Sequence, residues 1–317
     1  MANRILTHLE AILETGSVLA ASRRLFISQP SLSQYVKRLE EEYGITIFNR
    51  LTTPWTLTED GEQLIEAQRR IEEIERECRQ RFADKRALKT GEIRIASTAY
   101  RTATLLNPVL SQFKKENPGI VIRIEEGNTL EVMNLIEAGR ADCGVVISSM
   151  VPSSLEHVRV YTEEVLLGLP GDHPYVLAHP KPANRFDTLR LTDIAGTPFI
   201  IMKSGQAFHE YFYQLCAEEK LSFPVTLETQ SILTVPALIA TGIGAALIPS
   251  TIVEECIARR IAVYMPAVKL PANDVSIAWK RNRYQSHATR KFIERAKALL
   301  NVPKEQGDRM SYTNSKP

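Results

Sequence analysis

Apolar residues recur at intervals of three and four over much of the first sixty positions, which predicts helices rather than strands. Residues 2–14 form the first such segment, with four side chains on one face: Ile5, Leu9, Ile12 and Leu13. A second helix is expected after Ser17, because serine commonly caps a helix N-terminus. The short turn that follows carries Phe26 and Ile27, and we expect both to pack between helices.

The third helix has two chemically distinct faces. Ser28 is expected to cap it, with Pro30 in its first turn, where a missing N–H group costs nothing. Its apolar face should be buried: Leu32, Tyr35, Val36, Leu39 and Tyr43. The outward face carries amides, hydroxyls and two cations: Gln29, Ser31, Ser33, Gln34, Lys37 and Arg38. Neutral hydrogen-bonding groups suit base edges and cations suit phosphates, so the pattern predicts a DNA-reading helix-turn-helix.

Two further elements complete this part of the chain. Residues 45–48 begin a short wing of extended chain, and residues 52–56 turn it. From Thr58 to about Leu88 we expect one long, highly charged helix that starts with acidic residues, as the helix dipole favours. Its narrow apolar stripe includes a seven-residue repeat: Leu57, Leu64, Ile71 and Cys78. So narrow a stripe should pair with a second copy, although an isolated charged spacer is the alternative.

Beyond Gly91 the pattern changes to alternating strands and helices. We expect strands at 92–96, 120–125 and 143–147, and helices at 102–116 and 129–138. This order predicts a parallel sheet with helices on both faces. A second unit is expected to have strands near 163–169, 199–202, 225–228, 244–248 and 261–265, and helices near 207–220, 231–241 and 250–259. A strand at 275–280 and a helix at 287–300 follow, and residues 303–317 should be disordered because they have little to bury.

Composition bounds the class of protein. A chain of 317 residues is too long for one small core, which predicts two or three domains. No run approaches the ~20 apolar residues of a membrane span, and the start MANRILTHLE lacks an export signal. The scattered cysteines, with no CxxC pair, fit a reducing compartment better than a disulfide framework or a zinc site. We therefore expect a cytoplasmic protein without membrane association.

Charge alone does not indicate a nucleic-acid partner. The net charge is +2, and residues 1–60 contain six lysines and arginines against seven acidic residues. The DNA hypothesis therefore depends on how residues are arranged, and such weak basicity would require more than one DNA-binding unit per complex.

Polar residues gather where predicted strands end, which is where open α/β sheets bind ligands. In the first α/β unit the candidate residues at these strand ends, apolar neighbours included, are Ser97, Thr98, Ala99, Tyr100, Asn128, Thr129 and Ile147. In the second unit they are Lys203, Ser204 and Ser231. Hydroxyls and free N–H groups suit a small anionic metabolite. The alternatives are that these residues only cap helices, and that Arg101 is a surface charge.

Motifs of catalysis and of cofactor binding are missing from the sequence. The six histidines form no HExxH or other metal spacing, and no GxSxG is present. The glycines at 242 and 244 follow a predicted helix, and Leu247 stands where a dinucleotide loop needs a third glycine. We expect no catalytic residue, no metal site and no cofactor.

The N-terminal motifs resemble the signature of LysR-type transcriptional regulators. They are SQPSLS at 28–33, KRLE at 37–40, Phe48 with Arg50, and LTEDG at 57–61. The resemblance extends from residue 1 to about 302. It implies an α/β protein with a winged helix-turn-helix at 1–60 and a dimerising linker helix at 61–89. It also implies an effector-binding domain at 90–302, built like a periplasmic solute-binding protein, with one lobe at 91–164 plus 268–302 and the other at 165–267.

The resemblance further implies a regulator that binds a dyad-containing promoter site and changes DNA bending when a metabolite enters the cleft between the lobes. Implied partners are double-stranded DNA, the effector, a second copy in a dimer that pairs into a tetramer, and RNA polymerase. DNA contacts would come from Gln29, Pro30, Ser31, Ser33, Gln34, Lys37, Arg38, Arg50, Thr52 and Thr53. The family wing often carries basic residues where this chain has threonines, and Trp55 would either contact DNA or pack on the linker helix.

Two other hypotheses stay beside this one. The chain could be a solute-binding or enzymatic α/β protein whose N-terminal helices serve only dimerisation. One branch of the family senses peroxide through cysteines, but Cys216 and Cys256 lie far apart in this sequence, so we do not expect redox sensing.

Overall fold

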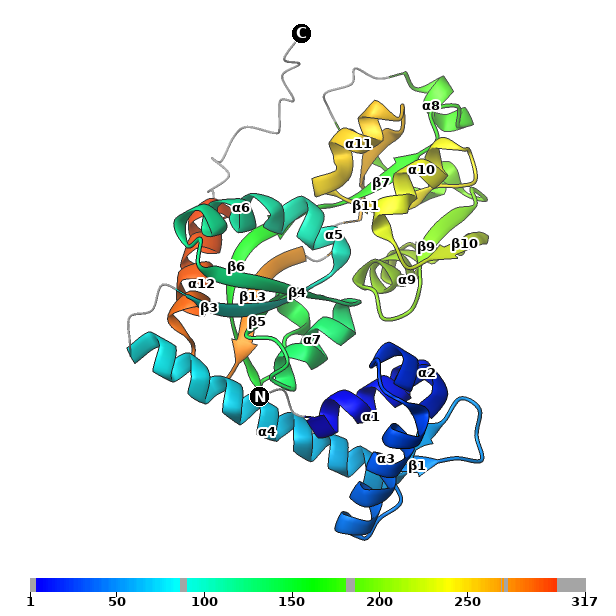
Figure 1. Ribbon diagram of the computed structural model, residues 1–317. Helices are drawn as coiled ribbons and strands as arrows, with labels where there is room; N and C mark the ends of the chain where they lie inside the picture. Colours follow the sequence, from blue (N-terminus) through cyan, green and yellow to red (C-terminus); the bar gives the residue numbers. More distant parts are fainter. Residues whose placement is uncertain (1–3, 86–89, 181–185, 269, 271–272, 301–317) are drawn as a thin grey trace. The chain divides into compact units, whose positions relative to one another are not determined.

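A computed structural model describes residues 4–85, 90–180, 186–268, 270 and 273–300 (Figure 1). The chain divides into two compact units, residues 1–86 and residues 87–317, and each is considered by itself. The predicted disordered tail at 303–317 and the end of the predicted linker at 86–89 lie outside the described residues. None of the helices within those residues is long and apolar enough to cross a membrane.

The first unit is a winged helix-turn-helix followed by a long helix, as the sequence predicts. Its helices are α1 (Arg4–Thr15), α2 (Val18–Arg24), α3 (Gln29–Tyr43) and α4 (Glu59–Lys85), and its wing is an antiparallel pair, β1 (Phe48–Asn49) and β2 (Thr56–Leu57). Both predicted caps are confirmed. The Ser17 hydroxyl accepts from the Ala20 N–H at 3.2 Å, and that of Ser28 accepts from the Ser31 N–H at 3.3 Å.

One apolar core closes this unit, with α1, α3, the wing and the start of α4 contributing fully or nearly fully buried side chains: Leu9, Ile12, Leu32, Val36, Ile47, Phe48 and Ile65. Three expectations about burial were wrong. Tyr43, at the end of α3, is 44% exposed, and in the turn Phe26 is 95% and Ile27 36% exposed. Phe26 has a left-handed φ of 54° where α2 ends, and its side chain is left in solvent rather than between the helices.

The LTEDG motif fixes the start of α4 against the wing. The Thr58 hydroxyl accepts from the Gly61 N–H at 3.0 Å, as a helix cap does. A Cβ atom at Gly61 would lie 2.2 Å from the carbonyl oxygen of Ile47, so only glycine allows this close approach. The motif therefore has a structural reason that is independent of DNA.

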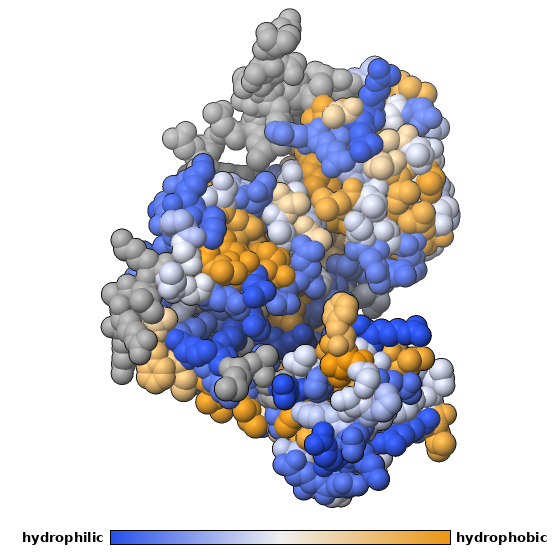
Figure 2. Space-filling view, in the orientation of Figure 1, coloured by the Kyte–Doolittle hydropathy of each residue, from blue (hydrophilic) through white to orange (hydrophobic). Residues whose placement is uncertain are grey.

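The predicted apolar stripe of α4 is used in two ways. Leu64 is buried in the helix-turn-helix core, whereas the later members of the repeat, Ile71 and Cys78, are exposed, and so are Ile74 and Phe82 beside them. Their spacings of three and four residues place them on one face of the helix. Apolar side chains follow one another along α4 at the lower left of the view in Figure 2. Within the first unit, this half of the stripe has no apolar cover.

The second unit has two lobes, each with its own sheet (Figure 1). Lobe I is built on a five-stranded sheet in the order β4-β3-β5-β13-β6. Its strands are β3 (Gly91–Ser97), β4 (Ile120–Glu126), β5 (Cys143–Ile147), β6 (Leu155–Glu163) and β13 (Asn273–Lys280). Its helical segments are α5 (Ala99–Arg101), the π-helical η1 (Thr102–Leu106), α6 (Asn107–Glu116), α7 (Thr129–Glu137), the 3₁₀ turn η2 (Ser148–Met150) and α12 (His287–Leu300).

Helices cover both faces of the lobe I sheet, as predicted. Ile95 and Val145 belong to the apolar cluster under α6 and α12, whereas their neighbours Ala96 and Val146 belong to the cluster under α7. This division follows from the alternation of side chains along a strand. The prediction of a parallel sheet holds for β3, β4 and β5, but β13 pairs antiparallel with both β5 and β6, so the sheet is mixed.

Most of strand β6 was not predicted from the sequence. It is the edge strand of its sheet, so part of it meets solvent and carries polar residues such as His157 and Arg159. The apolar alternation of Leu155, Val158 and Val160 is irregular, which hides the strand until Val165 begins the next.

Lobe II has a four-stranded sheet in the order β11-β7-β12-β8 and a parallel pair, β9 and β10. Its strands are β7 (Val165–Leu169), β8 (Thr188–Leu189), β9 (Phe199–Met202), β10 (Val225–Thr229), β11 (Ala246–Pro249) and β12 (Ala262–Pro266). Its helical segments are α8 (Pro174–Ala178), η3 (Leu191–Ile194), α9 (Ala207–Glu219), η4 (Ile232–Thr234), α10 (Val235–Ala240), η5 (Ser250–Ile252) and α11 (Val253–Ala258). The lobes are joined where β6 continues into β7 and where β12 leads to β13.

Candidate functional site

The outward face of α3 is a continuous polar surface. Every residue that the sequence predicts to face DNA on this helix is exposed: Gln29, Pro30, Ser31, Ser33, Gln34, Lys37 and Arg38. The opposite face is anchored by Leu32, Val36 and Leu39 in the core. Because amides and hydroxyls precede the cations along the helix, base-edge donors and acceptors come first and phosphate-binding groups follow.

The candidate DNA-binding residues of the wing make more contacts within the protein than those on the outward face of α3. Arg50 forms an ion pair with Glu40 at 2.6 Å, and its guanidinium carbon lies 5.6 Å from the centre of the Trp55 ring. Trp55 is half-buried, packs on Phe48 with ring centres 5.9 Å apart, and belongs to the edge of the core. Trp55 therefore packs within the protein, as one alternative expects, but it packs on Phe48 of the wing rather than on the linker helix.

Thr52 and Thr53 lie at the turn of the wing. The Thr52 hydroxyl donates to the Asn49 carbonyl at 3.1 Å and lies 3.2 Å from the Thr56 hydroxyl, so it helps to close the turn. Thr53 is exposed and precedes the cis-proline Pro54.

In the second unit, four loops that follow strands enclose a cavity of about 370 Å³ between the lobes. It lies beyond the carboxyl ends of β3 and β4 in lobe I and of β9 and β10 in lobe II, as expected for open sheets. Seven of the predicted residues line it: Thr98, Ala99, Tyr100, Asn128, Thr129, Ser204 and Ser231. Gly127, Met202, Gln206 and Gln230, from the loops expected at these strand ends, also line it, and sequence reasoning missed the other lining residues: Glu126, Glu131, Ala207, Phe208, Ile232 and Leu233.

Three predicted residues do not line this cavity. Ser97 is fully buried at the end of β3, and its hydroxyl donates to the Thr98 carbonyl. Ile147 is buried in an apolar cluster with Tyr100 and the lobe II core. Lys203 is exposed; its backbone N–H donates to the Thr229 carbonyl at 2.9 Å, and its carbonyl accepts from the Gln206 N–H at 3.3 Å. Position next to a strand end does not settle on which side of the strand a side chain emerges.

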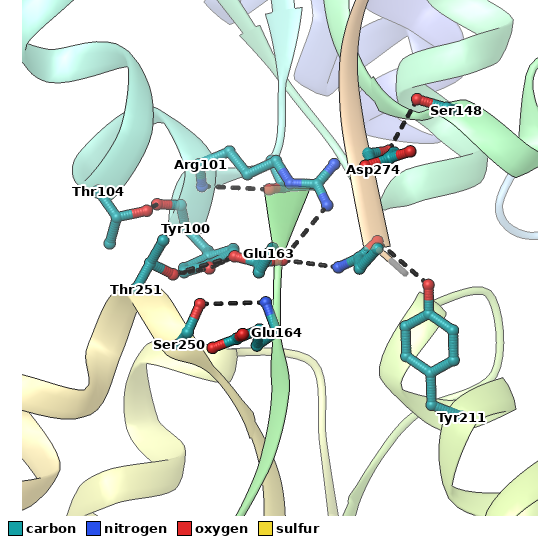
Figure 3. A network of polar contacts seen from close by, with 12 residues as sticks. Tyr100, Arg101, Thr104, Ser148, Glu163, Glu164, Tyr211, Ser250, Thr251 and Asp274 are labelled. Carbon is teal, nitrogen blue, oxygen red and sulfur yellow. Dashed lines mark hydrogen bonds and ion pairs between the residues drawn. The ribbon is translucent and has the colours of Figure 1, made fainter. Parts of the chain in front are cut away.

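Arg101 is the charged residue at the closed side of the cavity, not the surface charge that the sequence left open. Its side chain is 6% exposed, and one guanidinium nitrogen lies 3.9 Å from a carboxylate oxygen of Glu163. Figure 3 shows Arg101 and Tyr100 from α5 converging on Glu163 at the end of β6. The cavity therefore adjoins the strand that crosses between the lobes.

Glu163 has its hydrogen bonds filled by groups from both lobes. Tyr100 donates to it, the Thr251 hydroxyl donates at 3.0 Å, and the Asn273 amide donates at 2.6 Å (Figure 3). Asn273 also accepts from the Tyr211 hydroxyl at 3.1 Å. Burial, together with the negative charge of Glu163, raises the pKa of Tyr100, so the phenol keeps its proton and remains a donor.

Arg101, by contrast, has much of its hydrogen-bonding capacity left. A guanidinium carries five N–H donors. Among the residues that the structure describes, the Glu163 contact is the ion pair that Arg101 makes, and 3.9 Å is too long for a hydrogen bond. A buried guanidinium with unfilled donors beside a cavity is suited to receive a carboxylate or another small anion.

The cysteines of lobe II are not placed for easy oxidation. Burial raises the pKa of the Cys216 thiol and, reinforced by Glu255, raises the pKa of Cys256 to about 12. Since the thiolate is the reactive form, both thiols are poorly reactive near neutral pH.

Comparison with known proteins identifies the two units. Residues 4–62 match the family described as "Bacterial regulatory helix-turn-helix protein, lysR family", and residues 86–301 match "LysR substrate binding domain". The chain belongs to the LysR family of transcriptional regulators. It is therefore a DNA-binding regulator with an effector-binding domain, and the family is not enzymatic.

Individual relatives of this LysR regulator are distant. The uncharacterized HTH-type transcriptional regulator YcgK of Bacillus subtilis is 26% identical, with 96% of each chain covered. Full-length CbnR complexed with its target DNA has 19% identity and a TM-score of 0.66, with 94% of this chain and 99% of that chain covered. The effector-binding domain of QuiR in complex with shikimate has 15% identity and a TM-score of 0.58, with 67% and 98% covered. The two structures support the fold of this LysR regulator.

Proposed function

We propose that this LysR regulator captures a small anionic metabolite between its two lobes and thereby changes how it bends a promoter site containing a dyad. In this proposal residues 1–60 bind DNA, 61–89 form the linker and 90–302 bind the effector, with lobe I at 91–164 plus 268–302 and lobe II at 165–267. The protein acts in the cytoplasm, and RNA polymerase is a further partner. The observation that carries the ligand half is the buried, incompletely bonded Arg101 beside the cavity.

The DNA half of the proposal assigns roles by position on α3. Gln29, Pro30, Ser31, Ser33 and Gln34 lie in the first turns and approach base edges in the major groove. Lys37 and Arg38, about two turns later, hold phosphates, and Arg50, Thr52 and Thr53 do so from the wing. The same fold in CbnR is found complexed with its target DNA, which supports a similar use of these elements here.

Two copies are needed to place two such heads on one site. The exposed stripe of Ile71, Ile74, Cys78 and Phe82 on α4 is the surface that we assign to the dimer, and pairing of dimers would give the tetramer. Two-fold symmetry in the protein then matches the dyad in the DNA. Ile74→Lys would place a charge in this surface and should convert dimers to monomers in sedimentation experiments, whereas Arg70→Ala on the flank of α4 should not.

The effector half rests on the cavity. Thr98, Asn128 and Ser204 contribute hydroxyl and amide groups to its wall, and Arg101 contributes the charge. The QuiR domain, which has the same fold, forms a complex with the small molecule shikimate. Because Tyr100 lines the cavity and also bonds to Glu163 at the crossover, a ligand that prefers one arrangement of the lobes would shift their equilibrium.

A gel-shift series tests the proposal. A duplex selected from a random library with the full-length protein should be bound by the full chain and not by a chain lacking residues 1–60. Binding of the duplex by the truncated chain would instead support the rival hypothesis. In that hypothesis the N-terminal helices only dimerise an α/β binding protein or enzyme. The ligand half is tested by thermal melting against a library of metabolites, where a ligand at a hundred times its Kd stabilises by ~2.7 kcal/mol. At roughly 2–4 °C per kcal/mol for a domain of this size, that corresponds to a rise in melting temperature of about 5–11 °C.

A further inference from the structure

The charged residues around the cavity are of both signs. Arg101 is a cation among the lining residues, and Glu126 and Glu131 are anions. The other lining residues are neutral, so the described wall of the cavity carries one positive and two negative side chains. A ligand with negative charge alone would meet Arg101 favourably but would also face two carboxylates.

The two signs come from different elements. Arg101 follows β3 and lies against the crossover residue Glu163, whereas Glu126 ends β4 and Glu131 lies in the first turn of α7. Arg101 is almost completely buried, and Glu126 is exposed. One end of a ligand would therefore be held by a desolvated cation and another end by a carboxylate that remains in contact with water.

Of the two carboxylates, Glu126 has more freedom to bind a ligand. Glu131 already serves the capping box of α7, in which one of its oxygens accepts from the Asn128 N–H at 2.7 Å. The Glu126 carboxylate has no hydrogen-bond or ion-pair partner among the described residues, whereas Arg123 on the same strand is paired with Glu92. An acidic side chain at the wall of a cavity, left without a cation, is suited to receive an ammonium group.

Part of the wall on the lobe II side is apolar. Met202, Phe208, Ile232 and Leu233 all line the cavity, and Phe208 is held by an edge-on contact with Tyr211. The volume of about 370 Å³ is near the small end of the usual range for ligand sites, roughly 300–1,000 Å³. An apolar group of a few carbon atoms would fit beside the two charged ends.

We infer that the effector is a zwitterion of the amino-acid type, with its carboxylate on Arg101, its ammonium on Glu126 and an apolar side chain against the wall formed by Met202, Phe208 and Leu233. This inference rests on the proposed function, because it assumes that the cavity between the lobes is the effector site. It adds that the effector carries a positive group as well as the negative one. Bidentate bonding of a carboxylate to a guanidinium accounts for the first contact, and an ion pair for the second.

Matched probes separate the two charged ends. We would measure thermal stabilisation of the full-length protein by the twenty proteinogenic L-amino acids. We would then compare leucine with 3-methylbutylamine, which lacks its carboxylate, and with 4-methylpentanoic acid, which lacks its ammonium. Phenylalanine, phenethylamine and 3-phenylpropanoic acid form a second set. At a hundred times its Kd, an apolar amino acid that binds should raise the melting temperature by roughly 5–11 °C, and the four truncated compounds at the same concentration should raise it far less.

Variants assign each end to its residue. Glu126→Gln changes an exposed side chain, should leave the melting temperature of the free protein unchanged, and should weaken amino-acid binding about fivefold. It should narrow the preference for leucine over 4-methylpentanoic acid by the same factor. Glu125→Gln is the control, because side chains alternate along β4 and Glu125 is not at the cavity. Arg101→Gln should weaken binding about a hundredfold, with Arg101→Lys, which keeps the charge, intermediate.

The outcomes distinguish this inference from the proposed function. If 4-methylpentanoic acid stabilises the protein as well as leucine, or if Glu126→Gln does not change amino-acid binding, the effector is not a zwitterion. An anionic effector bound to Arg101 would remain consistent with either result. If no amino acid stabilises the protein but another metabolite does, and Arg101→Gln removes that effect, the inference fails and the proposed function stands. If no compound of a broad library stabilises the full-length protein, both the inference and the ligand half of the proposed function fail.

Discussion

The outward face of α3 and the cavity between the lobes hold polar residues in opposite ways. On α3 the outward side chains from Gln29 to Arg38 are exposed and lie on one stretch of helix. At the cavity, Tyr100 and Arg101 are buried and contact Glu163, which also bonds to residues far away in the sequence (Figure 3). The residues that we propose to face DNA therefore do not contribute to the core, whereas Tyr100 and Arg101 at the cavity are part of what holds the two lobes together.

This difference indicates which substitutions should change function without changing stability. Under the proposed function, a change on the outer face of α3 should remove a contact with DNA and little else, since surface substitutions usually alter stability by less than about 0.5 kcal/mol. A change at Arg101, Tyr100 or Glu163 alters ligand contacts and the junction of the lobes together. We expect evolution to retune the DNA site by simple substitution and the effector site mainly through its exposed wall, such as Glu126 and Ser231.

The largest expected effect comes from Glu163→Ala. It leaves Arg101 buried without its anion and removes the acceptor of the bonds from Tyr100, Thr251 and Asn273. Loss of one partner of a buried pair should lower the free energy of unfolding of the second unit by about 3 kcal/mol. Urea unfolding followed by Trp279 fluorescence, in a chain carrying Trp55→Phe, would measure it.

The control for that measurement is Glu126→Gln, an exposed carboxylate in the same unit that should change the free energy of unfolding by less than about 0.5 kcal/mol. If Glu163→Ala costs no more than Glu126→Gln, the network at the crossover does not hold the lobes, and the contrast between the two regions fails.

The same contrast explains what could be predicted from the sequence. Six of the seven candidates on α3, all but Pro30, could be assigned to its exposed face because one helix period relates them to Leu32, Val36 and Leu39. Ser17 and Ser28 could be identified as caps because a cap acts within three residues of itself. Phe26 was misjudged because a left-handed residue that ends a helix turns its side chain away from the packed side.

Prediction of the cavity was necessarily less complete. The rule that ligands bind beyond strand ends was enough to find Thr98, Asn128 and Ser204. It could not show that Ser97 turns into the core or that Lys203 turns to solvent, because one residue of register reverses a side chain. Arg101 looks like any surface arginine in the sequence, since its partner Glu163 is distant along the chain. A strand at 275–280 was predicted, but the antiparallel place of β13 between β5 and β6 could not be foreseen, because strand order and register depend on the tertiary fold.

A second prediction tests whether residues on the outward face of α3 affect DNA binding without affecting stability. Gln29→Ala should weaken binding to a selected duplex by about 1–3 kcal/mol, because an amide that reads a base edge is lost. Binding to random duplex should be nearly unchanged, and so should the melting temperature of the free protein. Fluorescence anisotropy with both duplexes would measure the two affinities. Equal losses on selected and random DNA would contradict the role assigned to Gln29.

Lys37→Ala is the matching variant on the same face. A lysine that holds a phosphate should weaken binding to both duplexes alike, and the salt slope should become shallower by roughly 0.9. In the free protein Lys37 is exposed and makes only a loose pair with Glu41 at 3.6 Å, so stability should not change. A loss confined to the selected duplex would reassign Lys37 to base reading.

A smaller effect should come from Glu40→Gln, which tests whether the wing is as free as α3. Glu40 holds Arg50 in an ion pair and accepts from the Ile47 N–H at 3.0 Å. Glutamine keeps an acceptor for Ile47 but releases Arg50 and removes a negative charge near DNA. Affinity for any duplex should rise by about fivefold, with a steeper salt slope. Unchanged or weaker binding would show that Arg50 does not reach phosphates.

The smallest expected effect concerns His8, a polar group inside the first unit. Its ring packs edge-on against Tyr35 with centres 4.6 Å apart, and burial, with the nearby charge of Arg4, lowers its pKa. Because the folded unit resists a proton that the unfolded chain accepts near pH 6.5, stability should be unaffected above that pH and should fall as pH drops below it. In a Trp279→Phe chain, urea unfolding followed by Trp55 fluorescence at pH 7.5 and 5.5 should show a smaller loss for His8→Phe than for the chain with His8. An equal loss would mean that His8 does not couple this unit to pH, and that here, as on the outer face of α3, a polar residue is independent of the fold.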